Sequence, residues 1–273
     1  MKNKIGIIGL GNMGSAIAEG IKCKFDVFVF DKDHLKAKNI TKVKLYPDLN
    51  RLLEDSEVII LAVKPQDFGP LLNEIKPGVS GKLVISIAAG LPTSYIENIL
   101  VDSRVVRVMP NLPARICKGV SWVSKGKLAD DKDLKFVLRL FHLLGTALIL
   151  DESMMDKATA FSGSGPGFWA HAMEGKPRNE WKEYTKKVFI PELCKAAVSI
   201  GFDERRARVV ADKTCRGSLS TVIAWNIEPK ELEKQVASKG GTTEAGLAVL
   251  ANGGSLVDAL LAAVKRAEEL SGG

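Results

Sequence analysis

Two patterns of apolar residues divide the chain. In its first half, short continuous apolar runs alternate with stretches whose apolar positions recur every three or four residues. Such runs are typical of strands buried on both faces, and such stretches are typical of amphipathic helices. We therefore expect strands at 4–8, 26–30, 58–63, 83–88, 104–108, 120–124 and 147–150. We expect helices at 12–22, 48–54, 66–75 and 131–144.

After residue 151 the apolar spacing is helical and no convincing strand remains. Helices are expected at 153–161, 166–173, 183–200, 204–225, 229–237, 243–251 and 255–270. The chain thus predicts an α/β fold with a Rossmann-type, doubly wound, mostly parallel sheet. The predicted dinucleotide-binding domain comprises residues 1–151, and the predicted all-helical domain comprises residues 152–273.

A glycine-rich loop follows the first predicted strand and opens the first predicted helix. In this context the first glycine allows a tight turn, the second lets the backbone approach a pyrophosphate, and the third lets helix and strand pack closely. The helix N-terminus adds partial positive charge. An ordinary glycine-rich turn is the alternative. The predicted pyrophosphate loop consists of Gly9, Leu10, Gly11, Asn12, Met13 and Gly14.

The second predicted strand ends at an acidic residue, Asp31. A carboxylate there accepts hydrogen bonds from the adenosine ribose and repels a 2′-phosphate, which favours NADH. Lys32, His34 and Lys36 argue for NADPH, because nearby cations can hold that phosphate. We expect NAD(P)H with NADH favoured; a solvated turn acid is the alternative for Asp31.

A second segment of glycines and hydroxyls opens a helix late in the chain. Free backbone N–H groups at a helix start attract anions, and a small carboxylic acid suits such a site. One chain that holds a dinucleotide and a small acid has the layout of a reductase. Capping by Thr242 and Thr243 is the alternative, although capping and binding can coexist. The segment comprises Ser238, Lys239, Gly240, Gly241, Thr242, Thr243, Glu244, Ala245 and Gly246.

Composition excludes several other classes. The net charge is +7, but lysines and arginines are interspersed with acids and no nucleic-acid motif accompanies them. No apolar run is long enough to span a bilayer, so a cytoplasmic protein is expected. The four cysteines are widely spaced, without a CxxC or a Cys/His cluster, so we expect neither a metal site nor a disulfide framework.

Six separated blocks follow one another in a characteristic order. They are 9–20 (GLGNMGSAIAEG), 61–66 (LAVKPQ), 85–90 (ISIAAG), 107–114 (RVMPNLPA), 162–166 (SGSGP) and 240–250 (GGTTEAGLAVL). Together they resemble the pyrroline-5-carboxylate reductase family. The resemblance implies reduction of 1-pyrroline-5-carboxylate to L-proline, a step of amino-acid biosynthesis. It also implies that the helical domain makes a homodimer or a ring of dimers.

The resemblance also assigns roles to residues. The nicotinamide-ribose side would be lined by Ala62, Val63, Lys64 and Pro65, and the nicotinamide bordered by Ala88, Gly90, Met109 and Asn111. The substrate carboxylate would be held by Ser238, Gly240, Gly241, Thr242 and Thr243, with Thr243 as the main polar contact and candidate catalytic residue. The segment 162–166 fits a helix junction and a ligand contact equally well.

The chemistry of a cyclic imine suits these residue types. A ring protonated at nitrogen already accepts hydride, so the protein mainly has to position it. Two alternatives stay open: a relative that acts on another cyclic imino acid, and a non-catalytic dinucleotide-binding protein. The second would not need the distal anion site.

The chain departs from the family pattern near Glu174. Between Glu174 and the Gly201-Phe202 turn the chain has roughly seventeen residues more than the family pattern, and we place this additional segment near 175–191. Gly175 and Pro177 should break the helix there. We expect an additional helical turn or two and a surface loop there, which would affect the dimer more than cofactor binding. Lys239 also replaces a usual proline, and Gly167 a usual alanine.

Overall fold

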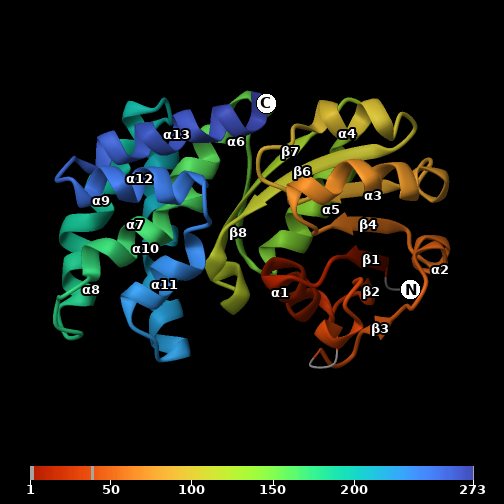
Figure 1. Ribbon diagram of the computed structural model, residues 1–273, viewed down its shortest axis with the longest axis horizontal. Coiled ribbons are helices and arrows are strands. Elements are labelled where there is room, and N and C mark those ends of the chain that lie inside the picture. Colours follow the sequence, from red (N-terminus) through yellow and green to blue (C-terminus); the bar gives the residue numbers. More distant parts are fainter. Residues whose placement is uncertain (1–2, 38–39, 273) are drawn as a thin grey trace. The chain divides into compact units, whose positions relative to one another are not determined.

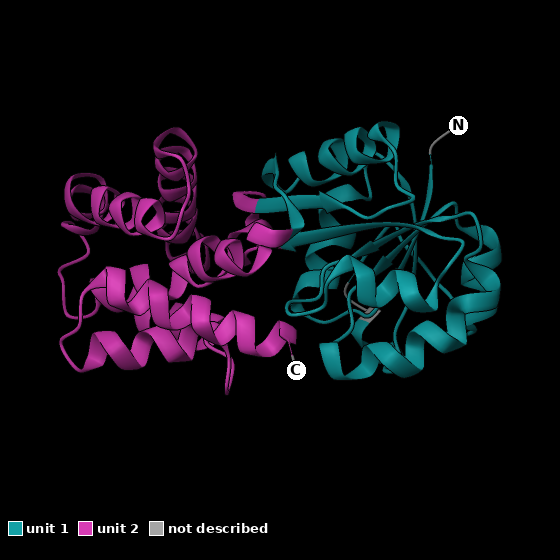
Figure 2. Cartoon of the chain, turned by 90° about the horizontal axis from the view of Figure 1, so that it is seen from above, with its two compact units in different colours: residues 1–109, 121–152 teal, residues 110–120, 153–273 magenta. Residues whose placement is uncertain are grey.

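The structure is a computed structural model that describes residues 3–37 and 40–272. The chain forms two compact units, unit 1 with Met1–Met109 and Ser121–Glu152, and unit 2 with Pro110–Val120 and Ser153–Gly273 (Figure 2). A single division of the sequence at residue 151 therefore leaves one segment out of place. Residues 110–120 belong to unit 2, where the Asn111 side chain donates to the Ser162 carbonyl oxygen (3.0 Å).

An eight-stranded sheet, ordered β3-β2-β1-β4-β5-β6-β7-β8, forms the centre of unit 1 (Figure 1). The pairings from β3 to β6 are parallel. The order of the first six strands is that of dinucleotide-binding domains, which confirms the expected fold class. The strands are β1 (Lys4–Ile8), β2 (Asp26–Phe30), β3 (Lys44–Leu45), β4 (Val58–Leu61), β5 (Leu83–Ser86), β6 (Arg104–Pro110), β7 (Gly119–Lys125) and β8 (Gly145–Ile149).

Every side chain of β4 and β5 is buried, because helices cover both faces of a parallel sheet. Apolar residues of α2 and α3 form one core with these strands. Helix α4 was not expected; it is short, and its amide at Thr93 donates to Glu152 Oε1 (3.1 Å). The helices of unit 1 are α1 (Asn12–Ile21), α2 (Leu49–Asp55), α3 (Phe68–Ile75), α4 (Thr93–Ile99) and α5 (Asp131–His142).

Unit 2 is helical apart from the ends of β6 and β7. Among the described residues, no helix has both the length and the apolar character that crossing a membrane requires. The helices are α6 (Met155–Ala158), α7 (Gly165–Met173), α8 (Trp181–Tyr184), α9 (Ile190–Ser199), α10 (Glu204–Trp225), α11 (Pro229–Val236), α12 (Thr242–Ala251) and α13 (Leu256–Gly272).

The additional segment 175–191 folds onto unit 2. Trp181 is 3% exposed, and its indole N–H donates to the Lys176 carbonyl oxygen (2.9 Å). The indole of Trp169 donates to Thr185 Oγ1 (2.8 Å), which ties the segment to α7. A π-helical turn, Thr185–Phe189, leads into α9 and comes just before Pro191, whose missing N–H would interrupt a regular helix.

Candidate functional site

The glycine loop lies where the chain reverses direction across the sheet, between β1 and β4. Gly9 has φ +100°, and a Cβ there would lie 2.7 Å from the Ala62 carbonyl oxygen. A Cβ on Gly14 would collide with the Gly9 carbonyl oxygen, whereas one on Gly11 would meet nothing within 4 Å. The first and third glycines therefore allow close packing, and the second leaves room for a ligand, as a pyrophosphate loop requires.

Helix α1 offers its N-terminus at this loop. Its N-cap is Gly11, its first turn has no acidic residue, and the amides of Asn12 and Met13 have no partner among the described residues. Such amides bind anions. A cavity of about 430 Å³ opens beside the loop, and it includes the predicted residues Gly9, Gly11, Asp31, Lys32, Ala62, Val63 and Lys64.

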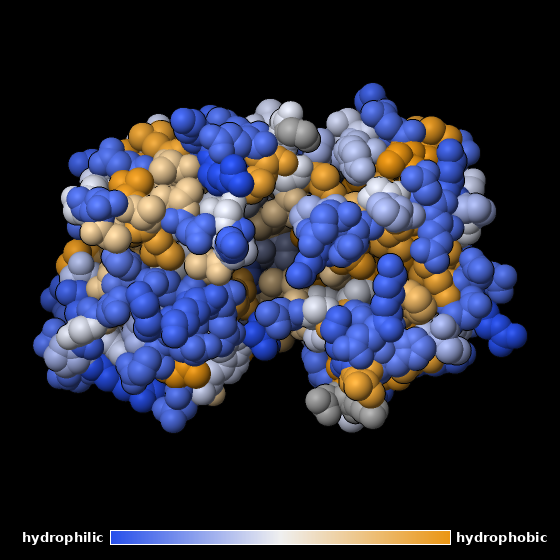
Figure 3. All heavy atoms as spheres, viewed as in Figure 1, coloured by the Kyte–Doolittle hydropathy of each residue, from blue (hydrophilic) through white to orange (hydrophobic). Residues whose placement is uncertain are grey.

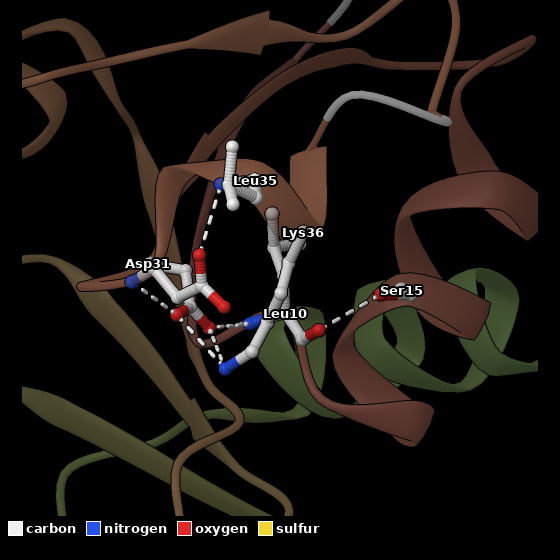
Figure 4. Close-up of polar contacts among 6 residues, drawn as sticks. Leu10, Ser15, Asp31, Leu35 and Lys36 are labelled. Atoms are coloured by element: carbon white, nitrogen blue, oxygen red, sulfur yellow. Dashed lines mark hydrogen bonds and ion pairs between the residues drawn. The ribbon is translucent and has the colours of Figure 1, made fainter.

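Asp31 is 8% exposed and held from three directions (Figure 4). Its Oδ2 accepts from the Leu10 amide (2.6 Å), and its Oδ1 accepts from the Asp33 amide (2.8 Å). Lys36 Nζ lies 3.0 Å from Oδ1. Burial would raise the pKa of Asp31, but these hydrogen bonds and the Lys36 charge outweigh it, so the pKa is lowered and the carboxylate is ionised.

The other cofactor positions differ in accessibility. Lys64 and Pro65 are exposed at a short 3₁₀ turn after β4. Ala88 is 4% exposed within the core, and Gly90 has φ +73° in the loop before α4. Lys64 and Pro65 thus lie in the segment that follows β4, and Ala88 and Gly90 lie in the segment that follows β5.

Met109 and Asn111 mark the end of β6, and only Met109 is partly exposed. Asn111 is 2% exposed and has both ends of its amide engaged, with Nδ2 on the Ser162 carbonyl oxygen and Oδ1 accepting from the Val120 amide (2.8 Å). This geometry gives the Asn111 side chain an internal role in unit 2, and its contact with the cofactor stays a prediction.

The second anion site is the start of α12, in unit 2. The amides of Thr242, Thr243 and Glu244 have no partner among the described residues. Thr243 is 4% exposed, and its hydroxyl donates to Ser164 Oγ (3.0 Å). Ser164 Oγ also lies 2.9 Å from Thr242 Oγ1. Open amides therefore stand beside a cluster of three hydroxyls.

Two backbone amides that were predicted to bind the substrate carboxylate already donate to other groups of the protein. The Gly240 amide donates to Glu244 Oε2 (2.6 Å), and the Gly241 amide donates to the Ser238 carbonyl oxygen (2.9 Å). We correct their assignment as carboxylate donors: these glycines shape the loop, and the open amides begin at Thr242. Ser238 is exposed and lies beside Gly241.

Ser164 is the residue whose role the sequence left open. It is fully buried at the start of α7, and its contact with Thr243 joins residues far apart in the chain. Gly167, one turn further along α7, faces the same threonine: a Cβ there would lie 2.5 Å from Thr243 Cγ2. The absence of a side chain at 167 thus lets α7 approach α12 closely.

Within residues 3–37 and 40–272, one group of side chains has the spacing of metal ligands. His171, Glu174 and Glu233 bring their ligand atoms within 4.8 Å of one another. Lys230 Nζ already lies 2.8 Å from Glu233 and 3.2 Å from Glu174, and these hydrogen bonds raise the pKa of Lys230. The Lys230 ammonium therefore already contacts both carboxylates and neutralises one of their two charges, and we assign no metal to this cluster.

Comparison with known proteins decides the family. Residues 187–270 match the model for pyrroline-5-carboxylate reductase dimerisation, and residues 4–90 match the model for NADP oxidoreductase, coenzyme F420-dependent. A pyrroline-5-carboxylate reductase of Methanosarcina acetivorans is 36% identical, over 98% of this chain and 97% of that protein. The Arabidopsis thaliana enzyme is 30% identical, over 98% and 95%. The chain belongs to the pyrroline-5-carboxylate reductase family.

Solved structures agree with this assignment. The pyrroline carboxylate reductase of Plasmodium falciparum, solved with NADP bound, has a TM-score of 0.63 and 29% identity, covering 98% of both chains. The enzyme of Coxiella burnetii has a TM-score of 0.66 and 28% identity, covering 99% of both. The reductase fold thus extends over the whole chain, and the two family models cover the glycine loop and the α12 start respectively.

Proposed function

We propose that this protein reduces 1-pyrroline-5-carboxylate to L-proline with NAD(P)H as hydride donor, in proline biosynthesis. Its dinucleotide-binding domain would be unit 1, and its substrate domain would be unit 2, which includes residues 110–120. The observation that carries the proposal is the presence of two distinct anion sites in a chain of this family. One is the glycine loop at α1, and the other is the group of open amides at α12.

The substrate of this reaction is a cyclic imine with a carboxylate. The amides of Thr242 and Thr243 would bind the carboxylate, which fixes the ring at one end. Because the Thr243 hydroxyl donates its hydrogen bond to Ser164 Oγ, the lone pairs of the Thr243 oxygen are left to accept a hydrogen bond from the N–H of the protonated ring. That hydrogen bond would favour the iminium form and orient its carbon. When bound, the reduced nicotinamide supplies the hydride that this carbon accepts.

We propose NADH as the preferred cofactor. The carboxylate of Asp31 is ionised and placed at the end of β2, where the adenosine ribose hydroxyls bind in this fold. Lys36, which could otherwise hold a 2′-phosphate, is paired with Asp31. Lys32 remains exposed, but a single solvated lysine beside a carboxylate is a weak phosphate site.

We also propose that two copies of unit 2 associate, as a homodimer or a ring of dimers, in the cytoplasm. A groove of about 870 Å³ runs between α9 and α10, and Val198 and Val209 on its walls are 43% and 41% exposed. Hydrophobic residues also gather where Figure 1 places α12 and α13 (Figure 3). A second copy that covers the groove would bury the side chains of Val198 and Val209.

The test is turnover by the purified protein. Oxidation of NADH and of NADPH is followed separately with 1-pyrroline-5-carboxylate, and then with its six-membered homologue. We expect formation of L-proline, with NADH giving the higher kcat/KM and the five-membered ring preferred. A Gly14→Val variant, which blocks the glycine loop, controls for reductases of the expression host. Absence of L-proline above that control would refute the proposal, and preference for the larger ring would reassign the substrate.

A further inference from the structure

Charged side chains hold both hydrogen-bonding groups of Gly240. Its N–H donates to Glu244 Oε2 (2.6 Å), and its carbonyl oxygen accepts from Arg266 Nε (2.7 Å). Glu244 lies in the first turn of α12, whereas Arg266 lies on α13 and also pairs with Glu269 (2.9 Å). An exposed loop residue is thus tied to two different helices.

The hydrogen bond from Arg266 fixes the orientation of the peptide between Gly240 and Gly241. Gly240 has φ +69°, and the N–H of the peptide that follows it donates to the Ser238 carbonyl oxygen. A flip of the peptide between Gly240 and Gly241 would break its hydrogen bonds to Arg266 and Ser238 and turn the Gly240 carbonyl oxygen toward the Ser238 carbonyl oxygen. The turn that leads into α12 would then change, and with it the direction of the open amides of Thr242 and Thr243. Ion pairs at exposed sites add little stability, so the effect expected of Arg266 is on this orientation.

We propose that Arg266 and Glu244 are positioning residues for the substrate carboxylate, an inference that rests on the function proposed above. Arg266 holds the Gly240 carbonyl oxygen, and Glu244 holds the Gly240 N–H, in the orientation that keeps the turn before α12. Neither residue touches the substrate; both keep the open amides at the start of α12 directed toward it.

The test compares Arg266→Gln with Lys265→Gln, which removes the same charge from the adjacent exposed position of α13. Each variant is assayed with 1-pyrroline-5-carboxylate and with 1-pyrroline, which lacks the carboxylate. We expect kcat/KM of Arg266→Gln to fall about tenfold with the first substrate, mainly through KM, because a hydrogen bond from a charged group is lost. With 1-pyrroline, and in Kd for NADH, it should match the wild type.

Further measurements separate positioning from folding. Lys265→Gln should change kcat/KM less than twofold, and Arg266→Lys should recover part of the loss. Adding Glu244→Ala to Arg266→Gln should cost less than the sum of the single effects, because both act on the same loop. Calorimetric binding of L-proline against pyrrolidine gives the same comparison without turnover.

Each outcome decides between named explanations. An equal loss with both substrates would mean a structural role and would overturn the inference. So would an Arg266→Gln variant that matches the wild type while the wild type reduces 1-pyrroline-5-carboxylate. A wild type without that activity, and without L-proline binding, would instead refute the proposed function on which the inference rests.

Discussion

Replacing Asp31 with asparagine should change cofactor preference more than cofactor affinity in general. The substitution keeps the shape of the side chain but leaves one acceptor oxygen where the carboxylate has two. The amides of Leu10 and Asp33 now donate to different oxygens, so one of them would face an amide NH₂ group. Lys36 would also lose its partner and become available to a 2′-phosphate.

The magnitude follows from the kind of bond that is lost. A hydrogen bond to a charged group contributes about 1.5–3 kcal/mol, and about 1.4 kcal/mol corresponds to a tenfold change. The ratio of kcat/KM for NADH to that for NADPH should therefore fall by roughly 10- to 150-fold in Asp31→Asn. The change combines weaker ribose binding with the removal of repulsion toward the phosphate.

The assay measures kcat/KM and Kd for both cofactors at one ionic strength, since salt screens the phosphate interaction. Asp33→Asn is the matched control, because it removes the same charge from an exposed neighbouring position. That control should shift the ratio by less than about threefold, as expected of a solvated charge. An equal loss of NADH and NADPH in Asp31→Asn would refute the reasoning, and so would a wild type that prefers NADPH.

Three further predictions concern other parts of the molecule. Thr243→Val should lower kcat/KM for 1-pyrroline-5-carboxylate about tenfold with Kd for NADH unchanged in fluorescence titration; equal weakening of NADH would count against the assigned role. Val209→Glu should convert a dimer into monomers in light scattering, whereas Val101→Glu, at an exposed position of unit 1, should not; unaltered mass would exclude the groove. The carboxylate of Asp31, whose pKa is lowered despite burial, stabilises the fold above its unfolded pKa of about 3.9. That stability is lost as the pH falls through the lower folded value, so acidification from pH 7 should reduce the unfolding free energy of the wild type more than that of Asp31→Asn; parallel losses in urea titrations would contradict this.

Local pattern was sufficient to predict most of the fold. Strands β4 and β5 are buried on both faces, so their apolar runs are unbroken and easy to recognise. The elements that were missed lack such a pattern. Both residues of β3 are exposed, and only Thr93 and Ile96 are buried in α4. Two exposed residues or a helix of two turns carry too little periodicity to be recognised.

In the candidate sites, too, local features could be predicted from the sequence, whereas contacts between distant residues could not. The glycine loop was predictable because each of its glycines has a separate steric reason. The contact between Ser164 and Thr243 spans 79 positions, and only folding brings the two hydroxyls together. The amides of Gly240 and Gly241 looked open in the sequence because their partners depend on how the loop turns.

A crystal structure of the enzyme with L-proline and oxidised cofactor tests the central claim most directly, namely that open amides at α12 hold the carboxylate of the small ring. We predict that the proline carboxylate lies within about 3.2 Å of the Thr242 or Thr243 nitrogen, at ordinary hydrogen-bond distance. The ring nitrogen should lie at the same distance from Thr243 Oγ1. Proline bound away from residues 242–243, or a carboxylate held only by side chains elsewhere, would contradict the account.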